Sequence, residues 1–264
     1  MIISKGNGMS LSKLFETKKS NILSVYFTAG FPMFEDTTII AKHLEDAGAD
    51  IIEIGIPFSD PIADGPVIQE SNTIALANGM SVAKLLEQVV EIRKEVMIPI
   101  ILMGYINPVL QYGMERFCKE ASEAGIDGLI LPDMPMGEYQ KVYKTLFEKH
   151  GLSNTFLISP TTSDVRIRKI DEATNGFIYA VSSSSTTGAK SGFSAEQELY
   201  FKKLKDMNLK NSFLVGFGIS NHQSFSKVCE YGAGAIVGSA FITILKNSKD
   251  LKTDIQLFVK SIVQ

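Results

Sequence analysis

Short apolar runs alternate with segments of helical periodicity along almost the whole chain, and this alternation constrains the fold more than any other feature. Strict strand-then-helix alternation is typical of a parallel sheet whose strands are joined by crossover helices. The expected strands are residues 22–28, 51–56, 98–103, 128–131, 155–158, 177–181, 213–215 and 235–237. Eight such units favour closure into a (β/α)8 barrel, and a chain of 264 residues suits that fold as one domain.

The segments between these strands have helical periodicity, and Gly48, Gly125 and Gly232 each come shortly before a strand, as an imperfect internal repeat. The expected helices are 12–19, 35–47, 67–77, 82–96, 114–124, 138–149, 164–173, 196–207 and 221–231, with closing helices to residue 263, and residues 105–108 are expected to form a loop. An open, doubly wound sheet is the alternative, but no G-x-G-x-x-G pattern follows the first strand. We therefore predict one α/β domain, a (β/α)8 TIM barrel with extra helices over residues 9–264. Residues 1–8 are expected to be a flexible extension or a cloning remnant.

Charge and cysteine content disfavour several classes of function. The net charge is −3 and no Lys/Arg run exceeds two residues, which argues against a nucleic-acid or anionic-membrane surface. No apolar stretch has transmembrane length, and the N-terminus lacks a signal-peptide core. Cys118 and Cys229 fall in unrelated helices, and His43, His150 and His222 are isolated. We therefore expect reduced thiols, no metal site and a cytoplasmic protein.

The stretch 50–69 concentrates the acidic residues that could carry chemistry. Glu53 interrupts an apolar strand, and Asp60 and Asp64 follow in a loop that three prolines make irregular. Because an unpaired buried charge is costly, Glu53 either forms a structural pair with a Lys or Arg or acts as a general acid/base. We favour the second interpretation, with a loop Asp aimed into the same pocket. Burial should then keep Glu53 from ionising while Asp64 stays charged.

Active sites of (β/α)8 barrels lie at the C-terminal ends of the strands, where this chain collects polar residues and glycines. The turns at 216–220 and 238–240 follow the last two strands, where backbone N–H groups and a helix N-terminus commonly bind phosphate. Tight connections without a ligand are the alternative. Thr187 and Gly188 could supply further donors, and the small polar residues of 182–193 favour a mobile lid over a linker.

The fourteen residues 53–66 (EIGIPFSDPIADGP) resemble the signature of the tryptophan synthase α-subunit family, and the similarity covers nearly the whole chain from about residue 14. The other matching segments are 28–30, 104–108, 132–135, 187–188, 216–220 and 238–240. The resemblance implies a lyase of L-tryptophan biosynthesis that cleaves indole-3-glycerol phosphate to indole and glyceraldehyde 3-phosphate by acid/base-assisted retro-aldol cleavage. Ser185 replaces a glycine usual in the family, so we expect this loop to close differently from the family pattern.

The resemblance also implies residue roles. Glu53 would protonate indole C3, Asp64 would accept the indole N1–H, and Tyr179 would align the reacting group. The implied substrate-binding residues are Tyr26, Met103, Tyr105, Ile130, Ile158, Thr187, Gly188, Phe217, Gly218, Gly238 and Ser239.

A partner is implied as well. The family works with a β subunit that carries pyridoxal phosphate and receives indole through a tunnel, in an α2β2 complex. Asp60, Asn107 and Pro108 match regions that face this partner. The resemblance implies no cofactor and no metal in this chain itself.

Three other functions stay open at this point. The chain could be a free-standing indole-glycerol-phosphate lyase, an aldolase or isomerase for another phosphorylated sugar, or a non-catalytic binding barrel. The presence of both Glu53 and Asp64 argues against the last of these.

Overall fold

The computed structural model describes residues 8–182 and 192–264, and within them nine parallel strands form one sheet. The strand order is β5-β4-β3-β2-β1-β9-β8-β7-β6. The strands are β1 (Ile22–Thr28), β2 (Ile51–Gly55), β3 (Ile100–Met103), β4 (Gly128–Ile130), β5 (Ser153–Thr155), β6 (Leu157–Ile158), β7 (Ile178–Val181), β8 (Phe213–Gly216) and β9 (Gly234–Val237).

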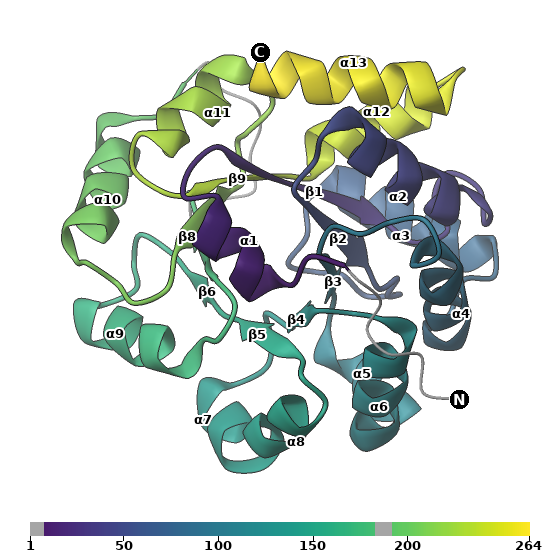
Figure 1. Ribbon diagram of the computed structural model, residues 1–264, viewed down its shortest axis with the longest axis horizontal. Helices are drawn as coiled ribbons and strands as arrows, with labels where there is room; N and C mark the ends of the chain where they lie inside the picture. Colours follow the sequence, from purple (N-terminus) through teal and green to yellow (C-terminus); the bar gives the residue numbers. More distant parts are fainter. Residues whose placement is uncertain (1–7, 183–191) are drawn as a thin grey trace.

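The two ends of this order, β5 and β6, are consecutive pieces of one chain segment with only Phe156 between them. β5 pairs with β4, and β6 pairs with β7. The sheet is therefore closed, and the single strand expected at 155–158 is divided into two pieces that together take one barrel position. The predicted (β/α)8 barrel is confirmed, with its helices outside the strands (Figure 1).

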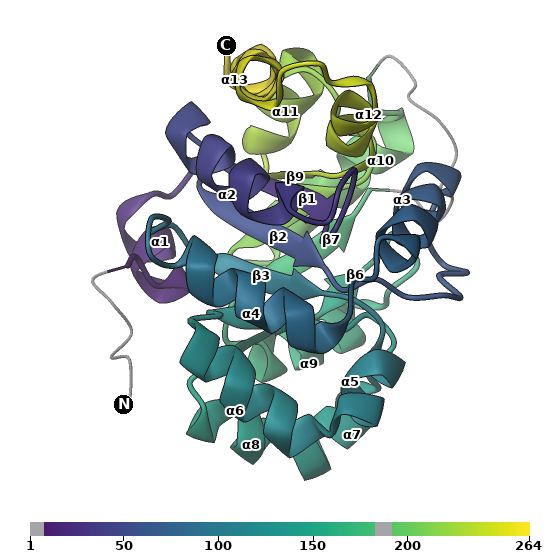
Figure 2. The ribbon, with the colours of Figure 1, turned by 90° about the vertical axis from the view of Figure 1, so that its right-hand side faces the viewer.

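Helices cover the outside of the barrel and one of its ends (Figures 1 and 2). They are α1 (Leu11–Thr17), α2 (Asp36–Ala47), α3 (Pro66–Ala77), α4 (Val82–Ile92), α5 (Ile106–Tyr112), α6 (Met114–Ala124), α7 (Met136–Glu138), the π-helix η1 (Tyr139–Tyr143), α8 (Lys144–Lys149), α9 (Asp164–Ala173), α10 (Ala195–Asp206), α11 (His222–Cys229), α12 (Ser239–Asn247) and α13 (Leu251–Val263).

Helix α5 corrects the sequence-based expectation of a loop at residues 105–108. Pro108 is the third residue of α5, where its missing N–H would have no partner inside the helix anyway, so this proline is compatible with a helix. Residues 1–7 lie outside the described part of the chain, so the domain boundary expected at residue 9 stays a prediction.

Two apolar clusters follow from the alternation of side chains along each strand. One fills the barrel interior and contains Ile51, Ile101 and Leu214, and the α1 residues Leu11 and Leu14 belong to it as well. The other packs the outer faces of the strands against the helices. Helix α1 thus closes one end of the barrel, and Figure 2 shows it on the opposite side of the strands from α3. The other end is left for a cavity.

Candidate active site

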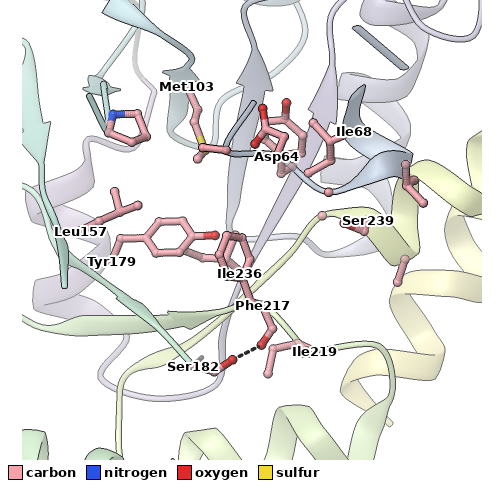
Figure 3. Close-up of a pocket in the computed structure, with 18 of the residues that line it drawn as sticks. Asp64, Ile68, Met103, Leu157, Tyr179, Ser182, Phe217, Ile219, Ile236 and Ser239 are labelled. Carbon is pink, nitrogen blue, oxygen red and sulfur yellow. Dashed lines mark hydrogen bonds between the residues drawn. The ribbon is translucent and has the colours of Figure 1, made fainter. Parts of the chain in front are cut away.

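A cavity of about 930 Å³ opens at the C-terminal ends of the strands. Its lining comes from every part of the barrel, including Tyr26 on β1, Met103 on β3, Leu157 on β6 and Tyr179 on β7. Figure 3 shows Met103, Leu157, Tyr179 and Phe217 around a common space that Asp64 also borders. This end of a (β/α)8 barrel is where the fold holds its active sites.

Glu53 stands in the middle of β2, beside Tyr26 of β1 and Ile101 of β3 in the strand register. It is fully buried and does not itself line the cavity. The Ser24 hydroxyl donates a hydrogen bond of 2.6 Å to Oε1, whereas Oε2 is buried and has no hydrogen-bond partner among the described residues. Within the described chain, no Lys or Arg forms an ion pair with Glu53, so the structural alternative loses its support.

Burial raises the pKa of Glu53 from 4.5 to about 7, although the hydrogen bond from Ser24 acts in the opposite direction. The carboxyl group therefore exchanges a proton near neutral pH. This agrees with the expectation that burial keeps Glu53 from ionising, and a pKa near the working pH is what a general acid/base needs.

Asp64 lies in the loop after β2 and is partly exposed in the cavity. The Tyr105 hydroxyl accepts a 3.0 Å hydrogen bond from the Ala63 N–H and bonds the Asp64 carboxylate, and its ring packs on Phe58 with centroids 5.0 Å apart. Burial raises the pKa of Asp64 to about 6, and the bond to Tyr105 opposes that shift. Asp64 is more exposed than Glu53, and the charged state expected for it stays a prediction.

The rings of Tyr26 and Tyr179 reach the cavity because Gly55 and Gly216, at the ends of neighbouring strands, have no side chain that would occupy the same space. A Cβ on Gly55 would stand 2.3 Å from the Tyr26 hydroxyl, and one on Gly216 would stand 2.3 Å from the Tyr179 ring. Burial and the nearby carboxyl groups of Glu53 and Asp64 raise the pKa of both phenols, so both stay neutral. Tyr26 and Tyr179 therefore offer hydroxyl groups and apolar ring faces rather than charge.

The end of the cavity near β8 and β9 is suited to an anion. Gly218, Gly238 and Ser239 line it, and α12 begins at Ser239, so the positive end of a helix faces this region. Phe217 and Gly218 both have positive φ, at 67° and 78°, and the Ser182 hydroxyl bonds the Phe217 carbonyl at 2.7 Å (Figure 3). No Lys or Arg is among the described lining residues. Backbone N–H groups and hydroxyls would have to hold the anion.

Most of the predicted substrate-binding residues meet in this cavity, and two do not. Ile130 lies deeper, in the barrel interior, and Ile158 packs in the outer cluster. Leu157 takes the cavity position, because it is level with Tyr179 in the sheet register and faces the same way. Thr187 and Gly188 lie outside the described residues. The predicted residues that do line the cavity are Tyr26, Asp64, Met103, Tyr105, Tyr179, Phe217, Gly218, Gly238 and Ser239.

Sequence reasoning also missed Ile56, Leu157 and Ile236, which contribute to the apolar wall. Strand alternation is a signal that could have found Leu157 and Ile236, but it becomes usable only when the facing residue of a neighbouring strand is known.

The residues predicted to face a partner are on the same side of the molecule as Asp64. Asp60 is exposed in the loop after β2, and Asn107 is exposed in the first turn of α5. The Ile106 N–H at the start of α5 donates a 2.9 Å hydrogen bond to Asp133 Oδ1, which ties the helix to the loop after β4.

The described residues contain no group of three or more His, Cys, Asp or Glu side chains that could hold a metal ion. In the same part of the chain, no helix combines the length and apolar character needed for a membrane crossing.

A cavity at the C-terminal ends of the strands, with a buried carboxyl group in the barrel interior, is typical of (β/α)8-barrel enzymes. Residues 11–262 match the family described as "Tryptophan synthase alpha chain", and the chain belongs to this family. It is 56% identical to the protein of that name from Flavobacterium johnsoniae over 95% of this chain and 97% of the relative. It is 58% identical to the Flavobacterium psychrophilum protein over 87% and 90% of the two chains.

Solved structures agree with this assignment. The tryptophan synthase alpha chain from Legionella pneumophila superposes with a TM-score of 0.84 at 37% identity, covering 96% of this chain and 94% of that one. A structure of Mycobacterium tuberculosis tryptophan synthase gives a TM-score of 0.85 at 29% identity, covering 97% of each chain.

Proposed function

We propose that this chain cleaves indole-3-glycerol phosphate to indole and glyceraldehyde 3-phosphate, as the α subunit of tryptophan synthase in L-tryptophan biosynthesis. The observation that carries the proposal is a buried carboxyl group in the barrel interior together with a second one that borders the cavity. Glu53 is buried with a pKa near 7, and Asp64 borders the cavity with a lower pKa. A buried proton donor and a second carboxyl group that borders the cavity are what acid/base cleavage of this substrate requires.

In this proposal Glu53 gives its proton to C3 of the indole ring, which makes the ring an electron sink. Asp64 accepts a hydrogen bond from the indole N1–H and stabilises the positive charge that develops on the ring. The hydroxyl group beside the breaking bond then loses its proton, and Glu53, now ionised, is available to take it. The C–C bond breaks, its electron pair returns to the ring, and the aldehyde and indole are the products.

The rest of the cavity would position the substrate. Tyr26, Met103, Tyr179 and Phe217 would hold the indole ring, with the Tyr179 and Phe217 rings edge to face at 6.3 Å between centroids. We place the phosphate at the other end, on Gly218, Gly238 and Ser239, where the first turn of α12 presents N–H groups.

We also propose a β subunit as partner, in an α2β2 complex, with pyridoxal phosphate bound to the partner and no cofactor in this chain. The exposed Asp60 and Asn107 would face the partner together with Pro108. Asp60 is near Asp64 in sequence, and Asn107 is near Tyr105. Contact with the partner at this face would therefore act on the Asp64 carboxylate and on the tyrosine that bonds it. Cys118 and Cys229 are free thiols, which fits a cytoplasmic enzyme.

An assay of indole release tests the proposal directly. The purified chain is incubated with indole-3-glycerol phosphate, alone and with β subunit, and indole and glyceraldehyde 3-phosphate are quantified. We expect equal amounts of both products and faster release with β subunit. Full activity alone, without acceleration, would favour a free-standing lyase. Turnover of other phosphorylated sugars without indole release would contradict the proposal.

A further inference from the structure

Ser24 is a polar residue in the barrel interior that the proposed mechanism does not use. It lies on β1, two residues before Tyr26, and it is fully buried without lining the cavity. Its strand neighbours in the register are Ile51 and Ile236, both apolar. A buried hydroxyl among such neighbours needs a hydrogen-bond partner, and Ser24 bonds Oε1 of Glu53 at 2.6 Å.

We propose that Ser24 is a positioning residue for Glu53: it holds Oε1 and leaves Oε2 as the oxygen that exchanges a proton with the substrate. Oε2 is buried and has no hydrogen-bond partner among the described residues, so no described group competes for its proton. With Oε1 held by β1, the carboxyl group has one oxygen bound and one available. This inference rests on the proposed role of Glu53 as the acid/base.

The same hydrogen bond sets the acidity of Glu53. A hydroxyl that donates to a carboxylate stabilises the charged form, and here it offsets part of the effect of burial on the pKa. The titratable groups that interact with Glu53 are the phenols of Tyr26 on β1 and Tyr179 on β7, and both stay neutral. The register neighbour from β3 is the apolar Ile101. Ser24 is therefore the main group that opposes burial.

The test is the variant Ser24→Ala, followed by infrared titration of carboxyl groups. The Glu53 band is identified by its absence in Glu53→Gln. We expect the pKa of Glu53 to move upward by about one unit, since a hydrogen bond to a charged group has been lost. At neutral pH kcat for indole release should fall several-fold, because a carboxyl group of higher pKa is a weaker proton donor and its Oε1 is no longer held in place. KM should not change, because Ser24 does not line the cavity.

Three further variants separate positioning from a general packing effect. Ser122→Ala on α6 removes a serine hydroxyl that also makes a 2.6 Å bond, to the His150 carbonyl, and should leave the Glu53 titration unchanged. Ser24→Thr keeps a hydroxyl and should restore the wild-type pKa. If Ser24→Ala does not fold, Ser24→Cys replaces it, because a thiol is a much weaker donor.

An unchanged Glu53 titration in Ser24→Ala or Ser24→Cys overturns the inference, as does an equal shift in Ser122→Ala. If the wild-type chain releases no indole, the proposed function fails instead. The infrared titration needs no substrate, so it still decides whether Ser24 controls the Glu53 carboxyl group.

Discussion

The two carboxyl groups of the site are held in opposite ways. Glu53 sits in the middle of a strand, paired on both sides, without solvent contact and with one hydrogen bond from a neighbouring strand. Asp64 sits in a loop, partly exposed, and Tyr105 at the start of α5 holds it in place. Glu53 is thus held inside the barrel away from water, whereas Asp64 lies in a partly exposed loop at the edge of the cavity. Burial raises the pKa of both groups above their ordinary values.

The largest effect should come from removing the buried acid. Glu53→Gln keeps the shape but cannot release a proton, so kcat should fall on the order of 10³-fold or more, while substrate affinity stays nearly the same. Asp64→Asn keeps an acceptor and should cost about ten-fold less than that. Steady-state rates of indole release and measurements of substrate affinity check the predictions for both variants. Glu123→Gln, on the exposed face of α6, is the control and should change neither kcat nor substrate affinity. A Glu53→Gln variant with half of its turnover left would refute the acid role.

The burial of Glu53 should also make the folding stability of the chain depend on pH. The pKa of Glu53 is about 7 in the folded chain and near 4.5 when unfolded, so the unfolded chain gives up its proton first as the pH rises. Folding stability should therefore fall between about pH 4.5 and pH 7, by roughly 3 kcal/mol for this group. Urea denaturation over this range should show the fall in the wild-type chain and a smaller one in Glu53→Gln. Identical pH profiles would mean that the carboxyl group is not desolvated.

The buried part of the site, around Tyr179, should also tolerate extra side-chain volume poorly. Gly216→Ala would place a methyl group 2.3 Å from the Tyr179 ring, and we expect the free energy of unfolding to fall by about 2 kcal/mol with reduced activity. Gly137→Ala, which has no atom within 4 Å of the new Cβ, is the matched control. Denaturation midpoints compare the two variants. Equal stability of both would show that the Tyr179 ring moves freely, contrary to a rigid interior.

The smallest effect should come from removing the hydroxyl group that bonds Asp64. Tyr105→Phe keeps the packing on Phe58 but removes the hydroxyl that lowers the pKa of Asp64, which should then rise from about 6 by less than one unit. Indole release should fall several-fold near pH 6, where more Asp64 is protonated, and approach the wild-type rate near pH 8. A uniform loss at all pH values would assign Tyr105 to substrate binding alone.

Sequence patterns alone were enough for the architecture, and they singled out Glu53 and Asp64 as candidates. Helix α6, helix α9 and strand β1 have the predicted bounds, because each is delimited by strong local signals such as Gly125 after α6. Glu53 and Asp64 stood out because a carboxyl group is costly inside an apolar strand and because the motif around them is distinctive. These are properties of neighbouring residues in the chain, which a sequence displays directly.

Contacts between distant segments were decided only by the tertiary structure. The register of β1 against β2 brings Ser24 to Glu53, and that of β6 against β7 turns Leu157 rather than Ile158 into the cavity. The loop expected at residues 105–108 became α5, whose N-terminus the distant Asp133 caps. Each outcome depends on which strands pair and at what offset. The physical reason is that a shift of one residue would turn every side chain of a strand to its other face, and no local pattern determines that offset.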